Sequence, residues 1–487
     1  MKIQLSDHFT YGRLLRFTWP SIVMMIFTSI YGVVDGIFVS NYAGKTAFAA
    51  LNLIMPYVMA FGTLGFMLGT GGTALISTTL GLGDKKRANE LFSMLTWVCA
   101  LGGAILTVIS LLLLRPVAIL LGATGQMLTD CVTYGAVVLS AMTAYILQFA
   151  FQSFCVAAEK PTLSLVMTVA SGVCNMVLDA LFVAVFRWGL IGAAAATAIS
   201  QVVGGIIPLV YFLRPNPSLL RLGKCRFYGR ELLRACTNGA SELMNNLSMS
   251  LVGMLYNLQL LRYAGENGIA AYGVIMYVNL FFLSVFIGFS IGTAPIFGFN
   301  HGADNRPELK SLFRKSILLL TVFSLAMLIC AEFLAKPLAQ IFVSYDPTLF
   351  DMTVRGFRIY ALSFLLCGFN MFGSSMFTAF NNGLISAVIS FVRTLICQIA
   401  AVMLLPLIWG LDGIWWAVVA AELTALVLTT VCFVKFRKKY HYQKKNTPLS
   451  ARFGTNEITL DLLLNHCNSR GLFHGILGFN HWVTSLS

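Results

Sequence analysis

Residues 163–186 read LSLVMTVASGVCNMVLDALFVAVF, a nearly all-apolar stretch that is long enough to cross a lipid bilayer as one helix. The stretch also carries the carboxylate of Asp179 and, one helical turn earlier, the amide of Asn175. A spacing of four residues places both side chains on one face of the helix. A carboxylate among lipid chains costs roughly 2.5–3.5 kcal/mol on insertion scales, so it normally faces a cavity or a partner. The stretch therefore predicts a membrane helix with a functional polar face, the alternative being a structural contact between helices.

The rest of the chain has the same character. Of its 487 residues, 58% are hydrophobic and 11% are charged, whereas soluble domains have about 25% charged residues. The strict alternation of a transmembrane β-barrel is missing from the sequence. We therefore predict an all-α integral membrane protein with twelve transmembrane helices. The apolar runs of spanning length are residues 14–39, 50–78, 91–114, 131–157, 162–186, 190–213, 234–262, 269–299, 312–334, 353–379, 384–408 and 412–436.

The net charge of +14 comes from the connections between these runs. Basic residues concentrate in alternate connections, such as Lys85–Lys86–Arg87, and in the long segment 214–233, while the opposite connections contain few. The positive-inside rule then places the basic side, and both termini, in the cytoplasm. This distribution explains the charge without a nucleic-acid partner.

The second half of the chain repeats the first at a constant offset of 221 residues. YAGKT from Tyr42 returns as YAGEN from Tyr263, and WGLIG from Trp188 returns as WGLDG from Trp409. Because each half contains six spans, the halves enter the membrane in the same direction and are expected to form two pseudo-symmetric lobes with a cleft between them. The predicted parts are an N-lobe (1–213), a cytoplasmic linker (214–233), a C-lobe (234–440) and a poorly ordered cytoplasmic tail (441–487).

The polar residues of the first half are not repeated. A polar group needed only to build the scaffold would be expected in both halves, so this asymmetry favours a functional role. At the offset of 221 residues, the partners of Asp35, Asn175, Asp179 and Thr197 are Tyr256, Ile396, Ala400 and Val418.

Those four residues all fall in the outer half of the predicted membrane region and can converge on one site. Two carboxylates, an amide and a hydroxyl supply oxygen ligands that suit a hard monovalent cation such as Na+. Paired carboxylates can also carry a proton. None of the six His lies within a predicted span, so a titrating carrier would have to be a carboxylate. We therefore expect H+ or Na+ coupling at Asp35, Asn175, Asp179 and Thr197, and no cofactor.

Other buried charges and one proline add to this picture. Glu242 lies deep in the seventh predicted span, and Glu422 in the twelfth is either functional or a packing contact. Arg393 is the only deep cation that opposes the acids. Pro20 removes a backbone hydrogen bond inside the first span and is expected to bend it. The chain has no phosphate-binding loop, zinc motif or nucleophile elbow, so we expect it not to be an enzyme.

With these features the sequence resembles the multidrug and toxic compound extrusion (MATE) transporters, and within them the bacterial MepA-like branch. The resemblance rests on the two six-helix repeats, on WP at Trp19, on VVDGIFVSNYAG from Val33 and on NMVLD from Asn175. It implies coupling-ion or proton binding at positions that match Asp35, Asn175, Asp179 and Thr197, together with a tyrosine that matches Tyr134. It also implies a bend at Pro20 and a seventh-helix acid at Glu242. The tenth-span aspartate of one branch is missing from LLCGFNMFGSSMF, residues 365–377.

The predicted function is secondary active multidrug efflux from the bacterial inner membrane. Cationic or amphipathic compounds would leave in antiport with H+ or Na+ by alternating access, carried by a monomer that contacts membrane lipid. The alternative is a flippase for a lipid-linked saccharide, which needs a cationic cleft to hold a pyrophosphate. Acids predominate over Arg393 among the deep charges, which favours export of cationic drugs.

Overall fold

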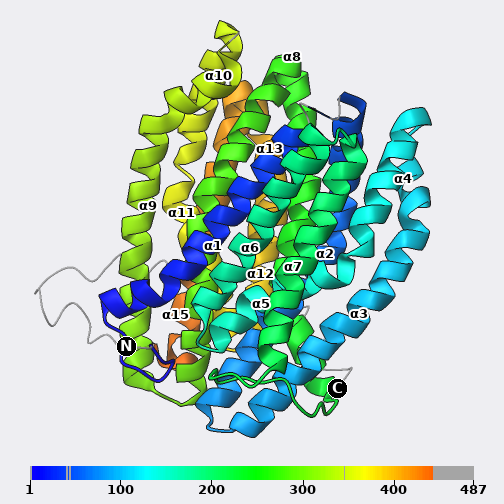
Figure 1. Cartoon of the computed structure of the whole chain (residues 1–487). Helices are drawn as coiled ribbons and strands as arrows, with labels where there is room; N and C mark the ends of the chain where they lie inside the picture. The colour runs from blue at the N-terminus through cyan, green and yellow to red at the C-terminus, as the bar shows by residue number, and fades with distance from the viewer. Residues whose placement is uncertain (1–2, 40–41, 43–44, 345, 443–487) are drawn as a thin grey trace, which may run out of the picture. The chain divides into compact units, whose positions relative to one another are not determined.

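A computed structural model describes residues 3–39, 42, 45–344 and 346–442, a part of the chain that is helical and contains no strand (Figure 1). Most of the predicted tail, from residue 443 onward, lies outside the described residues. In chain order the helices are α1 (Tyr11–Phe38), α2 (Lys45–Gly81), α3 (Lys85–Leu120), α4 (Gly125–Ser140), α5 (Met142–Ala157), α6 (Pro161–Asp179), the π-helix η2 (Ala180–Val185), α7 (Gly189–Leu213), α8 (Gly229–Gly302), α9 (Arg306–Val343), α10 (Pro347–Ala361), α11 (Phe364–Ala379), α12 (Gly383–Phe391), the π-helix η3 (Val392–Cys397), α13 (Gln398–Leu404), α14 (Pro406–Trp409) and α15 (Leu411–Tyr440).

These helices account for the predicted membrane spans. Within the described residues, 9 helical segments are long and apolar enough to cross a membrane, and two bent pairs bring the number to 11. The bent pairs are α4 with α5, at 56°, and α10 with α11, at 47°. At 74 residues α8 is far longer than the roughly 20 residues of one crossing, and its backbone is non-helical at Gly265. Counting α8 as two spans gives the twelve that the sequence predicts.

The internal repeat is visible in the turns between helices. Asp84 and its offset partner Asn305 cap α3 and α9 in the same way, because each side chain accepts a hydrogen bond from the main-chain N–H three residues later. Gly189 and its partner Gly410 both have positive φ, at 55° and 57°, which glycine adopts without steric cost. The two halves therefore share one scaffold, while the domain boundaries drawn from the sequence stay a prediction.

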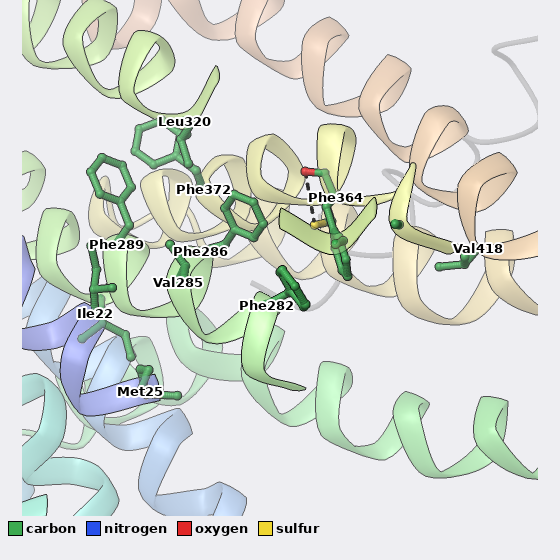
Figure 2. Packing of buried hydrophobic residues seen from close by; sticks show 14 of the residues in the cluster. Ile22, Met25, Phe282, Val285, Phe286, Phe289, Leu320, Phe364, Phe372 and Val418 are labelled. Carbon is green, nitrogen blue, oxygen red and sulfur yellow. Dashed lines mark hydrogen bonds between the residues drawn. The ribbon is translucent and has the colours of Figure 1, made fainter. Parts of the chain in front are cut away.

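Buried apolar side chains form two clusters. One lies among α2 to α7, and the other lies among the helices of the second half together with α1. Ile22 and Met25 of α1 belong to the same cluster as Phe286 and Phe289 of α8 (Figure 2). Because α1 also packs against α6, it joins the two halves and can position Asp35 next to both.

The backbones of the two halves approach each other closely at a pair of glycines, Gly81 and Gly302. A Cβ atom on Gly81 of α2 would lie 2.1 Å from the carbonyl oxygen of Phe299, and one on Gly302 of α8 would lie 2.1 Å from that of Thr78. Gly81 and Gly302 are offset partners, as are Thr78 and Phe299. The contact is therefore two-fold symmetric in sequence, and only glycine allows the backbones to come so close.

A second connection between the halves comes from the segment before α1. The main-chain N–H of Leu5 donates to Oε1 of Glu159 at 2.7 Å, and that of Phe9 donates to Oε1 of Glu308 at 2.9 Å. Leu5 and Phe9 are fully buried, and Nζ of Lys315 donates to the carbonyl oxygen of Phe9. The N-terminal segment thus connects the loop after α5 to the start of α9, which the sequence did not predict.

Candidate functional site

A cavity of about 630 Å³ lies between the two halves. Methionine, tyrosine and other apolar side chains make up much of its lining. Among the described residues that line it, the acids are Asp35, Glu242 and Glu422, and the only cation is Arg393. A concave, mostly apolar pocket with a few charged groups is typical of a small-molecule site.

Asp35 of α1 and Asp179 at the end of α6 come together beside this cavity. Asp35 is 8% exposed and lines the cavity, whereas Asp179 is fully buried and does not. The side chain of Asp35 interacts with those of Asn175 and Asp179. Within the described residues, however, Oδ1 of Asp35 and both carboxylate oxygens of Asp179 form no hydrogen bond of ordinary geometry. Buried polar groups are nearly always paired, so these oxygens require a ligand or a proton.

Tyr134 and Thr197 complete the cluster. Tyr134 of α4 is fully buried, and its hydroxyl lies near the side chain of Thr197 of α7 and near both carboxylates. Neither hydroxyl forms a hydrogen bond of ordinary geometry with the described part of the chain, and only Thr197 lines the cavity. The structure thus brings together the five residues singled out for ion coupling: Asp35, Tyr134, Asn175, Asp179 and Thr197. Their role in binding an ion remains a prediction.

In each half a π-helical segment lies next to buried charges. η2 begins directly after Asp179, and η3 contains Arg393. A π-helical turn inserts an extra residue into the helical ladder and occurs often at functional sites. Neither π-helical segment could be predicted from the apolar pattern of the sequence.

Two further predicted residues have clear positions. Glu242 of α8 lines the cavity, and its carboxylate interacts with the side chains of Asn245 and Arg393. Pro20 lies inside α1, and the expected bend at this residue stays a prediction.

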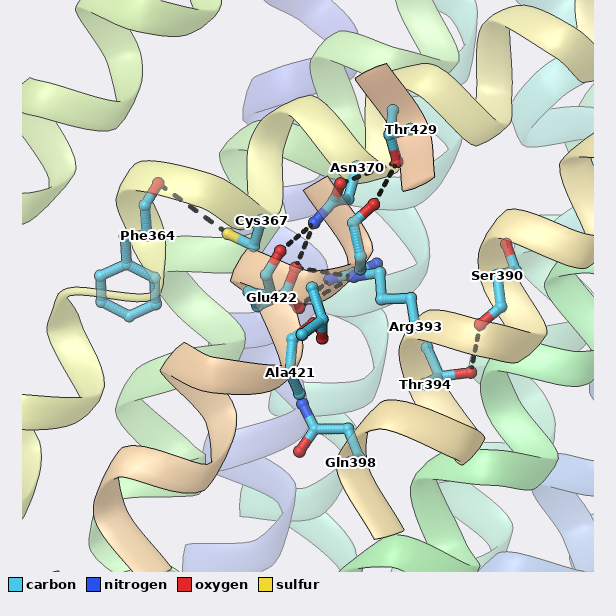
Figure 3. A network of polar contacts seen from close by, with 12 residues as sticks. Phe364, Cys367, Asn370, Ser390, Arg393, Thr394, Gln398, Ala421, Glu422 and Thr429 are labelled. Carbon is cyan, nitrogen blue, oxygen red and sulfur yellow. Dashed lines mark hydrogen bonds and ion pairs between the residues drawn. The ribbon is translucent and has the colours of Figure 1, made fainter. Parts of the chain in front are cut away.

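The second half contains a saturated polar network (Figure 3). Nε of Arg393 donates to Oε1 and Oε2 of Glu422 at 2.8 and 3.0 Å, and Nη2 lies 2.8 Å from Oε1. Nδ2 of Asn370 donates to Oε2 of Glu422 at 2.8 Å, and Oγ1 of Thr429 donates to Oδ1 of Asn370 at 2.8 Å. Glu422, which the sequence left open, is therefore a member of a buried ion pair. Its opposite charge to Arg393 was a usable signal, because charges inside membrane spans usually pair with one another.

Comparison with known proteins identifies the family. The MatE family model matches residues 20–181 and 243–404, once in each half. The multidrug export protein MepA of Staphylococcus saprophyticus is 25% identical over 410 residues, covering 84% of this chain and 90% of that protein.

Solved structures of transporters have the same fold. One, described as the outward-facing conformation of a multidrug resistance MATE transporter, has a TM-score of 0.84 at 21% identity, over 90% of this chain and 98% of that one. A MOP superfamily transporter of Pyrococcus furiosus, described as having a binding pocket of reversed polarity, has a TM-score of 0.82 at 22% identity over the same shares. Because the family model covers well over half of the chain, the protein belongs to the MatE family, the multidrug and toxic compound extrusion transporters, and is not an enzyme.

Proposed function

We propose that the protein exports cationic or amphipathic compounds from a bacterial cell in exchange for H+ or Na+. The observation that carries this proposal is the pair of buried carboxylates, Asp35 and Asp179, beside a cavity in which acids outnumber cations. Relatives named as multidrug export proteins support the direction and breadth of the transport.

Asp35 and Asp179 form the coupling site in this proposal. A buried carboxylate without hydrogen-bond partners is costly, so binding a proton or Na+ stabilises it. The amide of Asn175 and the hydroxyl of Thr197 add neutral oxygen ligands that suit a hard cation. The hydroxyl of Tyr134 is buried beside Thr197 and interacts electrostatically with both carboxylates, so Tyr134 belongs to the same polar cluster.

Glu242 and Asp35 give the cavity its charge preference. The charge of Glu422 is balanced by Arg393, so the two remaining acids favour a cationic ligand. The apolar lining, rich in methionine, can repack around different amphipathic bodies. A flippase for a lipid-linked pyrophosphate would need unpaired cations, but the only cation among the described lining residues is paired.

Exchange follows from linkage between two conformations. When the two aspartates are empty, the negative cavity favours the drug cation, and when protons or Na+ fill them, the drug is released. The glycine contacts of α2 and α8 lie next to the basic loops, the side that the positive-inside rule places in the cytoplasm. These contacts support a cavity closed to the cytoplasm and open to the outside.

The same rule supports an inner-membrane monomer, surrounded by lipid, with both termini in the cytoplasm. Lys85 is the exposed first residue of α3, on the proposed cytoplasmic side. The variant Lys85→Cys should therefore react with an impermeant thiol reagent in everted vesicles and not in intact cells. Reaction in intact cells alone would reverse the proposed orientation.

Transport by the purified protein in liposomes tests the function directly. A pH gradient and a Na+ gradient are imposed separately, and the movement of a fluorescent organic cation is followed. We expect one of the gradients to drive transport and its collapse to stop it. If neither gradient drives transport of any organic cation, the proposal is wrong.

The variant Glu242→Gln tests the charge preference of the cavity. It should weaken binding of a monocation more than that of a neutral analogue of the same shape, by up to about tenfold where water enters the cavity. Binding of the two compounds by the wild type and the variant is compared in lipid nanodiscs. Equal loss for both compounds would assign Glu242 to structure or to coupling.

A further inference from the structure

The second half contributes a positively charged side chain to the wall of the cavity. The export of cationic compounds does not explain its presence. Arg393 lines the cavity and is only 8% exposed. Arg393 lies inside η3, where the main-chain hydrogen bonds follow the π-helical pattern and not the α-helical one. A buried arginine facing a site for cationic drugs would repel them unless its charge were balanced.

Glu422 provides that balance and is itself saturated. Its carboxylate accepts hydrogen bonds from Nε of Arg393 and from Nδ2 of Asn370, and Nη2 of Arg393 forms an ion pair with its Oε1. Asn370 is fixed in turn by Thr429 and by the main-chain oxygen of Glu422. The pair is therefore neutral as a whole and is held in one geometry, so it does not exclude monocations from the cavity.

The guanidinium of Arg393 keeps unused donors. Arginine has five N–H groups, and the hydrogen bonds and the ion pair with Glu422 involve Nε and Nη2. No described residue forms a hydrogen bond with Nη1. An open guanidinium edge suits a carboxylate, sulfonate or phosphate oxygen, because the planar fork matches the geometry of these groups.

The surroundings of Arg393 suit a molecule with an aromatic body and both charges. Glu242 lines the same cavity and interacts electrostatically with Arg393. The rings of Tyr256 and Tyr272 also line it and stack at 5.0 Å between centroids. Oε1 of Gln398 accepts a hydrogen bond from the Tyr256 hydroxyl at 2.9 Å, which fixes that ring.

We propose that Arg393 is a specificity-determining residue that receives the anionic group of zwitterionic amphipathic compounds. Nη1 of Arg393 binds the anionic group, Glu242 faces the positive group, and the tyrosine rings contact the flat body. Glu422 and Asn370 are positioning residues that hold the guanidinium. The inference rests on the proposed function, since it concerns which compounds the same cavity accepts.

Two dyes of one scaffold test this assignment. A xanthene methyl ester is a monocation, and its free acid is a zwitterion. Binding of both is measured by fluorescence anisotropy with the full-length protein in lipid nanodiscs, so the result does not depend on transport. The measured quantity is the affinity for the free acid divided by the affinity for the ester.

Two single variants should move this ratio in opposite directions. Glu422→Gln keeps a side chain of similar size that still accepts from Asn370, but it removes the anion that competes for Arg393. We expect the ratio to rise by roughly tenfold, because a charge-assisted hydrogen bond is strengthened. Arg393→Lys keeps the charge but removes the planar fork, so the ratio should fall by roughly tenfold.

Controls separate specificity from folding. Thr424→Val changes an exposed residue of the same helix as Glu422 and should leave the ratio unchanged. The double variant Arg393→Gln/Glu422→Gln removes both charges together, leaves neither unpaired and should still lower the ratio. With the wild type alone, an aromatic sulfonate without a positive charge should displace the free acid more readily than the ester.

The outcomes are distinguishable. Equal changes for both dyes, or equal displacement of both by the sulfonate, would make Arg393 a structural residue and overturn the inference. In that case export of the ester would still support the proposed function. If the wild type neither binds nor exports either dye, the proposed function fails first.

Discussion

Asp179 in the first half and Glu422 in the second are both carboxylates buried within membrane helices, but their surroundings differ. Neither oxygen of Asp179 forms a hydrogen bond of ordinary geometry with a described residue, although the side chain interacts with Asp35, whereas Glu422 accepts from Arg393 and Asn370. The first carboxylate is the one that we propose takes up a proton or an ion. The second is saturated by the protein itself and is suited to hold a neighbouring group in place.

The difference shows how one scaffold can serve two purposes. The offset partner of Arg393 is Gly172, and a Cβ atom on Gly172 would lie 2.5 Å from Cε1 of Phe27 in α1. The first half therefore has no room for an arginine at this position, because α1 packs there. The offset partner of Asp179 is Ala400, so the second half has no second carboxylate to match. Side-chain chemistry diverged while the turns and helix breaks stayed alike.

The largest expected effect is in the first half. Asp179→Asn preserves the shape of the side chain and removes its charge, so gradient-driven transport should fall to background while the protein still inserts and folds. Asp35→Asn should act in the same way, and the double variant should be no worse than either, because residues that act as a unit are not additive. Transport in liposomes under the driving gradient measures all three.

The matched control for Asp179 lies at its offset position in the second half. Ala400→Ser alters packing without touching a proposed ligand, so ion dependence should stay unchanged. If Ala400→Ser changed ion dependence, coupling would not belong to the first half alone. Multiplicative losses in the Asp35 and Asp179 double variant would indicate two separate sites.

The glycine contact should behave identically in the two halves. Gly81→Leu and Gly302→Leu each place a side chain against the backbone of the opposite half, so both should prevent close approach and reduce transport by tenfold or more, an order-of-magnitude expectation from steric overlap. Gly102→Ala is a control in α3, because a Cβ atom there meets nothing within 4 Å. Unequal losses in the two leucine variants would show that the contact is not functionally symmetric.

Removing each of the two carboxylates should change the melting temperature in opposite directions, or change it only for Glu422. Glu422→Ala leaves the buried guanidinium of Arg393 without its counter-charge, which typically costs about 3–5 kcal/mol. Asp179→Asn removes a charge whose oxygens have no hydrogen-bond partner among the described residues, so stability should stay the same or rise. Melting temperatures in one detergent, without substrate, compare the variants. Destabilisation by Asp179→Asn as large as that by Glu422→Ala would contradict the difference in pairing.

The smallest change in stability is expected at the turn that contains Gly83 in the first half and the charged residue Asp304 in the second. Gly83 has φ 85° in the first half, and its partner Asp304 has φ 48°. Hydrogen bonds from the Arg306 guanidinium lower the pKa of the Asp304 carboxyl below its ordinary value of 3.8. The pairing therefore adds stability above that ordinary value, and this contribution is lost as the pH falls through the lowered pKa.

Asp304→Asn isolates that charge, because asparagine also tolerates positive φ. The variant should melt slightly below the wild type at neutral pH, and the difference should vanish in acid and at high salt. Melting curves at several pH values and salt concentrations measure it. A difference that persisted in acid would point to the backbone and not to the ion pair.

The sequence by itself determined the spans, the repeat and the polar cluster that we propose for coupling. Apolar runs of about 20 residues have few alternatives to membrane helices, because the backbone must satisfy its own hydrogen bonds in lipid. The constant offset from Tyr42 to Trp409 specified two similar halves. Asp35, Asn175 and Asp179 could be grouped in advance because polar groups in spans avoid lipid and must face inward.

Only the tertiary structure decided which buried groups meet. Arg393 and Glu422 lie on different helices, and their pairing depends on how those helices are rotated against each other, which the apolar pattern leaves open. The π-helical turns at Asp179 and Arg393 shift the register of one helix by a single residue, too small a change to alter the hydrophobic period. The bonds of the N-terminal segment to Glu159 and Glu308 join residues far apart in the chain. Such contacts form where packed helices bring distant groups together, so they follow from the packing and not from local sequence.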